Sequence, residues 1–341
     1  MPRLSELIRI PSTTAVLPKS FLELEYFSGT KEQLAFPSLG TPNHVFVTHD
    51  GPAHNECTLV ELVDEAFAGI VEQVSHERLI SLEGMRSIAV RIAQDLHRSE
   101  QLVSQVFSEK YSAPRIVSNA LNVAVLSTKM GMGLSYANKE LIDLALAALL
   151  HDIGKFLLPE ALVDSTEMSE ADNEKLFKRH PELGYNILKK LSSEPWLAEV
   201  VWQEHERWGG QGYPKGLKGE EIHQYAQIIG LADRFETMVN DEGLSSHDAI
   251  RLLLTNEKLN FHGQLLKVLV QQISLFPVGT VVRLTTGEVG TVEKTNPQHP
   301  LRPVLRMNRS GNSQTDSSLS LRDLSQDTLT HIKEVMKDHQ G

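Results

Sequence analysis

The stretch from residue 109 to about residue 273 constrains the fold most, because nearly all of it is patterned as helix. Apolar residues recur there at spacings of three and four, as on the buried face of an amphipathic helix, and strand-like alternation is almost absent. Pro114, Pro181 and Pro195 stand near the expected helix starts, where a missing N–H is tolerated. The sequence therefore predicts an all-α central domain. Its expected helices span residues 114–130, 138–151, 170–178, 180–192, 195–207, 219–240 and 246–273.

The parts of the chain on either side of this domain are patterned differently. The first 55 residues hold scattered prolines and one strand-like run, His44–Thr48, whereas residues 57–108 carry apolar stripes at helical spacing. After Phe276 the period changes to two, which is typical of strands. We therefore expect a mainly α protein with three parts: an N-terminal α(+β) region over 1–108, a helical bundle over 109–273 and a small β-barrel-like module over 274–341.

Composition and charge exclude several classes of function. With a formal net charge of −11, the chain lacks the broad basic face that a nucleic-acid polymer needs, although a metal site can still attract a small anion. Cys57 is the single cysteine, which rules out an internal disulfide and a thiolate zinc cluster. We see no signal-peptide pattern, and no stretch approaches the roughly 20 apolar residues of a membrane helix. We therefore expect a cytoplasmic protein without membrane or nucleic-acid-polymer partners.

Residues with metal-binding side chains follow the apolar runs of successive expected helices. The run Ala147–Leu150 ends in adjacent His151 and Asp152, and a carboxylate there can bridge two transition-metal ions. Asp233 closes the apolar run Ile229–Ala232, and a carboxylate buried there needs a partner such as a cation. Taken singly, such residues are more often surface or core residues than ligands. Together, spaced by one helix and one loop each, they can meet at one point of a bundle. The candidates are His151, Asp152, His180, Glu204, His205 and Asp233.

Five ordered motifs resemble those of the HD-GYP domain. This domain is the subset of the HD phosphohydrolase superfamily that cleaves the bacterial messenger cyclic di-GMP. The resemblance covers roughly residues 110–245, and the strand-patterned segment from residue 276 resembles a tail often appended to these domains. The motifs are His151–Lys155, His180–Pro181, His205–Trp208, Gly212–Leu217 and Ala232–Phe235.

The resemblance implies a site for two divalent metal ions, iron or manganese. Asp152 would bridge the two ions, and a metal-activated hydroxide would attack the phosphodiester. The remaining ligands would be His151 and Asp233 on one ion, and His180, Glu204 and His205 on the other.

The resemblance also implies which residues contact the substrate. Asp152 and Lys155 would be the catalytic residues, with Lys155 stabilising charge on the phosphate. The Gly-Tyr-Pro loop would form one wall of the pocket. The implied substrate-binding residues are Lys155, Arg207, Gly212, Tyr213 and Pro214.

The sequence departs from the family pattern at several positions. The family has a histidine about 32 residues before the HD motif, and that count lands on Asn119, so one of the two metal sites is expected to be weak or empty. The family's His-His-Glu triplet is Glu204–Glu206 here, and the aspartate before the Gly-Tyr-Pro loop is Gly209. The basic residues expected after Asp233 are replaced by the acidic stretch 240–244, which would repel phosphates unless it points away.

These departures leave three functions open. The leading prediction is an enzyme that hydrolyses cyclic di-GMP or a related cyclic dinucleotide. The first alternative is a catalytically degenerate module that binds a nucleotide or a signalling protein, and the second is a different phosphohydrolase on the same scaffold. Signalling proteins and a second copy of the chain are further expected partners.

Overall fold

The computed structural model describes most of the chain from residue 58 onwards, together with two short strands before it. The described residues are 15–16, 35–36, 58–99, 101–108, 113–158, 174–175, 177–273, 276, 278–296, 299, 301–307, 320–327 and 329–336. The strand expected at His44–Thr48 lies outside them, as does much of the helix expected at 170–178. The two short strands, β1 (Ala15–Val16) and β2 (Ala35–Phe36), pair antiparallel.

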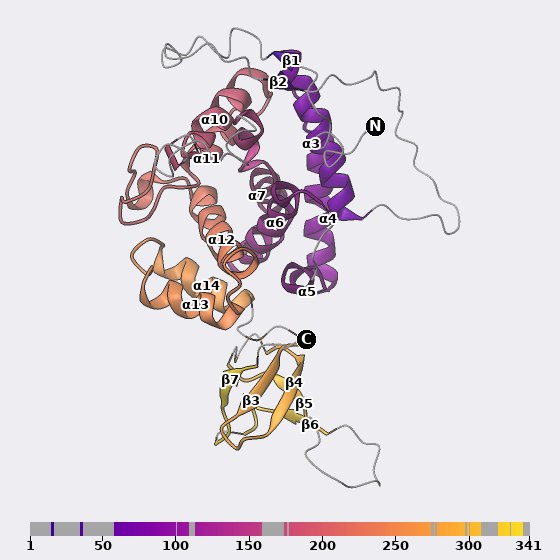
Figure 1. Ribbon diagram of the computed structural model, residues 1–341, viewed down its shortest axis with the longest axis vertical. Helices are drawn as coiled ribbons and strands as arrows, with labels where there is room; N and C mark the ends of the chain where they lie inside the picture. Colours follow the sequence, from indigo (N-terminus) through magenta and orange to yellow (C-terminus); the bar gives the residue numbers. More distant parts are fainter. Residues whose placement is uncertain are drawn as a thin grey trace, which may run out of the picture.

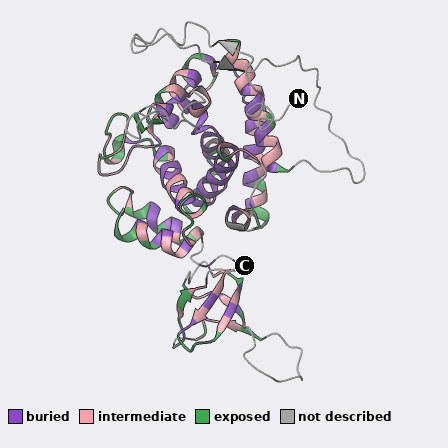
Figure 2. Ribbon diagram, viewed as in Figure 1, coloured by how far each residue is buried: buried purple, intermediate pink, exposed green. Residues whose placement is uncertain are grey.

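Helices α6 (Arg115–Gly133) and α7 (Asn138–Leu150) form the centre of the helical part (Figure 1). Every residue of α6 from Val117 to Gly131 is buried, and so is the second half of α7. A helix buried on all sides must be covered by neighbours around its circumference. In Figure 2 these two helices are mostly purple, whereas the surrounding helices mix buried and exposed faces. The core therefore fixes α7 and the residues that follow its end.

The surrounding helices pack on this pair from different sides. Their bounds are α3 Leu59–Ser75, α4 Glu83–Arg98, α5 Gln101–Ser108, α10 His180–Leu191, α11 Trp196–Gln203 and α12 Gln224–Asn240. Figure 1 shows α3, α4 and α5 on one side of the central pair, and α10 and α11 on the other. A capping box of Thr58 and Glu61 begins α3, and α4 ends at Arg98, with Ser99 as its C-cap. Within the described ranges, none of the helices has the length and apolarity to cross a bilayer.

Three expected helices have different bounds in the structure. The helix expected over 219–240 begins at Gln224, after the 3₁₀ turn η2 (Gly219–Glu221). The helix expected over 246–273 is two helices, α13 (Ser246–Thr255) and α14 (Gly263–Gln272). The turn between them is held from outside, because the carbonyl of Asn260 accepts a hydrogen bond from the backbone N–H of Trp208 (2.8 Å). The helix expected over 195–207 ends at Gln203, so the residues that follow turn away from the helix axis.

The C-terminal module is an open antiparallel sheet, so the expected small β module is confirmed, although its sheet does not close into a barrel. Its strands are β3 (Val281–Leu284), β4 (Val289–Lys294), β5 (Val304–Met307), β6 (Leu321–Asp323) and β7 (Ile332–Val335). The strand order β6-β5-β4-β3-β7 leaves β6 and β7 as the two edges. Thr286 and Gly287 lie in the tight turn between β3 and β4, where Gly287 has a φ of 88° that favours glycine.

Candidate metal centre

The first half of the candidate site is built where α7 ends. His151 follows the last residue of α7, and its Nδ1–H donates to the carbonyl oxygen of Ala148 (2.7 Å). The carbonyl oxygen can only accept, so in the neutral ring Nε2 carries a lone pair. Nε2 lies 3.3 Å from Oδ2 of Asp152 and 3.6 Å from Oδ1 of Asp233 on α12. The structure thus brings these three predicted ligands together.

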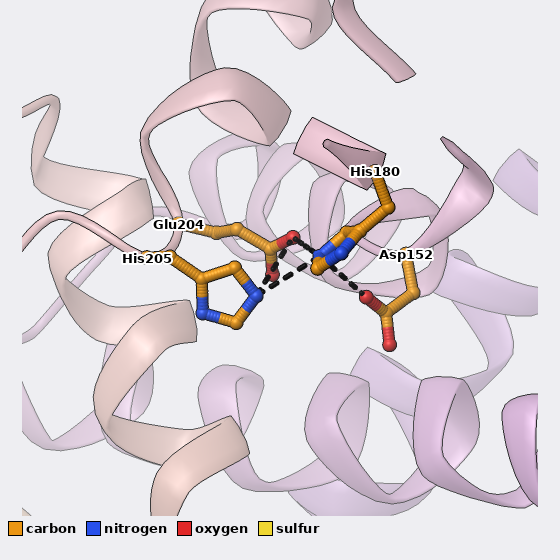
Figure 3. Close-up of side chains that lie close together, drawn as sticks. All are labelled: Asp152, His180, Glu204 and His205. Atoms are coloured by element: carbon orange, nitrogen blue, oxygen red, sulfur yellow. Dashed lines mark hydrogen bonds and ion pairs between the residues drawn. The ribbon is translucent and has the colours of Figure 1, made fainter. Parts of the chain in front are cut away.

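The second half is built at the start of α10 and just past the end of α11. His180 donates its Nδ1–H to the carbonyl oxygen of Phe177 (2.6 Å), and its Nε2 lies 3.3 Å from Oδ1 of Asp152. Oε1 of Glu204 is also 3.3 Å from this nitrogen, and Nε2 of His205 is 2.9 Å from it. Figure 3 shows Asp152, His180, Glu204 and His205 pointing toward one another. One ligand atom from each lies within 4.8 Å of the others.

Two glycines allow the backbones that carry these residues to approach closely. Gly154 lies in the 3₁₀ turn η1 (Ile153–Leu157), and a Cβ there would overlap the carbonyl oxygen of His180. Gly230 on α12 faces the carbonyl oxygen of Glu204 in the same way. Any larger residue at either position would push two ligand-bearing elements apart.

Two carboxylates face both halves of the site. Asp152 turns Oδ2 toward His151 and Oδ1 toward His180. Glu204 does the same, with Oε1 3.3 Å from Nε2 of His180 and Oε2 3.9 Å from Nε2 of His151. A carboxylate with its two oxygens turned to different ligand sets is suited to bridge two ions. The geometry suits Asp152 as the expected bridge and gives Glu204 the same option.

Buried acceptor atoms without partners make this donor set fit a cation. Among the described residues, Nε2 of His151, Oδ1 of Asp152 and Oε2 of Glu204 are buried and have no hydrogen-bond partner. Such atoms are rare in folded proteins, because a buried polar group without a partner is destabilising. Imidazole nitrogens and carboxylate oxygens are ligands that suit iron, manganese and zinc. The residues present therefore fit divalent transition-metal ions.

Positive groups partly balance the buried carboxylates. The ammonium group of Lys155 donates to Oδ2 of Asp152. Burial disfavours its charge, but the neighbouring Asp152 outweighs burial and raises the pKa of Lys155. Burial likewise opposes charge on His151, yet Asp152 and Glu204 raise the pKa of His151 well above its usual value. The site therefore attracts positive charge, as a metal centre must.

His205 and Tyr213 form a neutral edge of the site. Burial and the neighbouring His180 lower the pKa of His205 well below its usual value, which leaves a neutral imidazole at pH 7. The ring of Tyr213 stacks on this imidazole, with centroids 4.7 Å apart. Burial raises the pKa of Tyr213, so its hydroxyl keeps its proton and can donate a hydrogen bond to an anion.

Comparisons with known proteins identify the family. A family model described as an HD domain matches residues 97–267, half of the chain. The chain belongs to the HD domain family. A second model, described as a KOW domain associated with HD domain, matches residues 281–340, which contain the open sheet. The family resemblance recognised from the ordered motifs is thereby confirmed.

Curated relatives of this HD domain chain include cyclic di-GMP phosphodiesterases. PdeB of Borreliella burgdorferi is 25% identical over 198 residues, which cover 56% of this chain and 52% of the relative. A cyclic di-GMP phosphodiesterase of Pseudomonas aeruginosa is 29% identical over 170 residues, or 48% of this chain and 41% of the relative. The chain thus matches about half the length of these relatives.

A solved structure has the same fold. It is Bd1817, an HDG"Y"P protein from Bdellovibrio bacteriovorus, which aligns with a TM-score of 0.52 at 22% identity. The alignment covers 62% of this chain and 67% of that chain. At this identity the likeness concerns the arrangement of the elements, which supports the HD domain assignment.

A buried carboxylate behind the HD domain site was missed by the sequence analysis. Glu236 is fully buried on α12, one turn after Asp233. The amide of Asn119 donates both to Glu236 (2.8 Å) and to Oδ1 of Asp233 (3.2 Å), so Asn119 lies beside a candidate ligand. The spacing of three residues between Asp233 and Glu236, which puts both on one helix face, was the available signal. The residues that donate to Glu236 are Arg115, Asn119, Asn122 and Asn240.

The acidic stretch after α12 is paired with arginines. Asp241 accepts from Arg115 at 2.6 Å, and Glu242 accepts from Arg234, which also donates to Glu257. Each of these two carboxylates therefore has a guanidinium partner, which Asp241 shares with Glu236 and Glu242 shares with Glu257. These ion pairs reduce the repulsion of phosphates that the sequence of the stretch 240–244 predicts.

The residues predicted to contact substrate fall into two groups. Tyr213 lies at the edge of the site, and Gly212 and Pro214 flank it in the loop after α11. Arg207 instead directs Nη1 to two backbone carbonyls of the turn that carries Glu204, at 3.1 and 3.0 Å. This guanidinium stabilises the ligand-bearing turn, and its contact with substrate stays a prediction.

Replacing Glu206 by alanine is expected to loosen the loop that carries Tyr213. The buried Glu206 carboxylate accepts the backbone N–H of Lys215 (2.7 Å) and that of Leu217 (2.9 Å). Each hydrogen bond to a charged group contributes roughly 1.5–3 kcal/mol. Because two such bonds are lost, we expect a loss of about 3 kcal/mol in unfolding free energy and faster amide hydrogen exchange at both donors. Glu206→Gln retains one oxygen acceptor, so its stability and its exchange rates should lie between those of wild type and of Glu206→Ala. Unchanged amide exchange in Glu206→Ala would contradict the anchoring role of Glu206.

Proposed function

We propose that this chain is an HD-GYP-type phosphodiesterase that uses bound divalent metals to hydrolyse cyclic di-GMP. The observation that carries the proposal is the set of buried, unpaired donor atoms on the two sides of Asp152. The names of two curated relatives, both cyclic di-GMP phosphodiesterases, support the choice of substrate. Lys155 and Tyr213 at the same site suit an anionic ligand.

We assign the donor atoms to two ions, iron or manganese, held with unequal strength. The tighter side has four donors with converging lone pairs. The weaker side has three. Asn119 adds no ligand there, because its side-chain NH₂ group, and not a lone pair, is turned toward Asp233. Glu236 accepts from the same NH₂ group and so fixes the amide in this orientation. The tighter set is Asp152, His180, Glu204 and His205, and the weaker set is His151, Asp152 and Asp233.

The side chains around the metals have distinct roles in the proposed reaction. When bound, the ions would polarise the phosphate oxygens and lower the pKa of the attacking water. Asp152 and Glu204 hold the two halves of the site together. Lys155 places a positive charge beside Asp152, where it can stabilise the charge that develops on the phosphate. Tyr213, which keeps its proton, can donate a hydrogen bond to a phosphate oxygen.

Replacing Asn119 by histidine is expected to strengthen the weaker metal side. An imidazole there can donate one N–H to Glu236 and turn its other nitrogen toward Asp233, and carboxylates commonly orient metal-binding histidines in this way. We expect roughly tenfold tighter binding of the second ion, measured as metal retained against graded chelator. Asn122→His is the matched control, because Asn122 bonds Glu236 from the same helix. Equal retention in Asn119→His and wild type contradicts the unequal assignment.

A hydrolysis assay tests the proposed function. Protein purified without oxygen and loaded with iron or manganese should convert cyclic di-GMP to a linear dinucleotide, and chelation should stop the reaction. His151→Ala should lose the activity. Bound metal without product supports the alternative, a module that binds a nucleotide or a protein without turnover. If the protein cleaves another phosphodiester but not cyclic di-GMP, the proposed reaction type stands and the proposed substrate is wrong.

Location and protein partners are proposed from the sequence alone. We propose a cytoplasmic protein that contacts other signalling proteins or a second copy of itself. Fractionation and light scattering of the purified chain test the two points separately.

A further inference from the structure

Two aromatic side chains flank the facing histidines of the site. Phe177, just before α10, contacts His180 with ring centroids 5.1 Å apart. His180 and His205 have centroids 4.9 Å apart, and Tyr213 stacks on His205 at 4.7 Å. The four rings form one continuous row, with two candidate metal ligands in the middle and one aromatic ring at each end.

The ring of Phe177 is exposed where it meets this polar site. It keeps 44% of its surface accessible, whereas His180 beside it is fully buried. A single exposed apolar side chain needs no explanation on an ordinary surface. This one borders a buried cluster of candidate ligands, so a molecule bound at the cluster can cover it.

A lysine accompanies each of the two rings. Nζ of Lys155 lies 4.8 Å from the centroid of Phe177, and Nζ of Lys178 lies 5.6 Å from that of Tyr213. Lys178 also pairs with Glu174, and both of these side chains are exposed, so this ion pair is weak. A ring next to a cation matches a nucleotide, whose base stacks on the ring while its phosphate pairs with the cation.

We propose that Phe177 is a stacking platform for one base of the cyclic dinucleotide, at the opposite end of the ring row from Tyr213. This inference rests on the proposed function and adds a binding residue that the ordered motifs do not contain. Every base has an apolar face, so Phe177 contributes affinity rather than base identity. Lys178, beside Tyr213, pairs with a phosphate of the same ligand.

The test compares a ligand that has bases with one that has none. Phe177→Ala should raise KM for cyclic di-GMP about 5- to 30-fold, because base stacking on an aromatic residue supports a change of this order. Inhibition by inorganic phosphate and the bound metal should stay at wild-type levels. Phe177→Tyr retains the ring and should behave as wild type. Leu79→Ala, which removes an exposed side chain between α3 and α4, is the matched control. The KM for cyclic di-AMP should rise by the same factor in Phe177→Ala.

Each other outcome has a definite meaning. If KM and the phosphate inhibition constant rise together, Phe177 acts only by packing on Lys155 and His180, and the platform is overturned. If KM is unchanged while the enzyme turns over, the platform is overturned and the proposed function stands. If the wild type shows no turnover, the proposed function fails, and equilibrium binding of cyclic di-GMP decides: weaker binding to Phe177→Ala supports the platform, and equal binding overturns it.

Discussion

Replacing Asp152 by alanine is expected to abolish hydrolysis of cyclic di-GMP while the protein stays folded. One oxygen of this carboxylate faces His151 and Lys155, and the other faces His180. Its loss therefore removes a ligand from both proposed ions at once. Deleting a single group that stabilises transition-state charge already costs about 10²–10³ in rate, so we expect kcat/KM to fall by at least roughly 10³-fold. The measurement is product formation at saturating metal.

Two further variants separate loss of charge from loss of structure. Asp152→Asn keeps the size of the side chain and one oxygen but not the charge, and it should be nearly as inactive as the alanine variant. Asp95→Ala removes a partly exposed carboxylate of α4, whose nearest arginine nitrogens are 3.7 Å away, and should be fully active. An Asp152→Ala enzyme that retains a tenth or more of wild-type activity contradicts the bridging assignment.

Replacing Arg115 by alanine is expected to give the largest loss of stability. Its guanidinium donates to both oxygens of Glu236, a carboxylate with no exposed surface, and also to Asp241. Removing one partner of a buried ion pair leaves an uncompensated charge and costs about 3–5 kcal/mol. Arg115 is itself partly exposed and three amides still donate to Glu236, so we expect about 2–4 kcal/mol, or a Tm lower by roughly 4–9 °C. Denaturant and thermal unfolding measure both quantities.

A surface ion pair supplies the control for Arg115. Arg78 pairs with Glu72 at 2.8 Å but is 54% exposed, and such pairs contribute about 1 kcal/mol or less. Arg78→Ala should therefore lower the Tm by no more than a few degrees. If the two alanine variants are equally stable, the buried network does not stabilise the fold as argued.

Local sequence patterns predicted most of the helical core, because helix formation and burial leave a periodic signal. The apolar stripes over residues 57–108 correspond to α3, α4 and α5, and α6 and α7 lie where apolar residues dominate. The single helix expected over 246–273 was wrong: the turn that divides it contacts the backbone of Trp208, a residue far away in the sequence that local periodicity does not report. The small β module was expected from its strand-like alternation, but strand spacing alone does not fix the order of strands in its open sheet.

The candidate site was predictable where helix ends carry its residues. His151 and Asp152 follow α7, His180 begins α10, and the residues after α11 turn toward them, so motif order implied proximity. Glu236 was not predictable by the same reasoning, since its ion pair with Arg115 spans 121 residues. Phe177 belongs to none of the ordered motifs, and its proposed role as a stacking platform follows only from the rings around it in the structure.

The metal content of the chain, purified without oxygen and titrated with iron or manganese, tests the central claim most directly. Elemental analysis of folded wild-type protein should find more than one divalent ion per chain, with one side filled before the other. Asp152→Ala removes a ligand from both sides and should retain less than one ion per chain. A folded wild-type chain that takes up no iron or manganese would contradict the assignment of this buried cluster as a metal centre, and with it the proposed reaction.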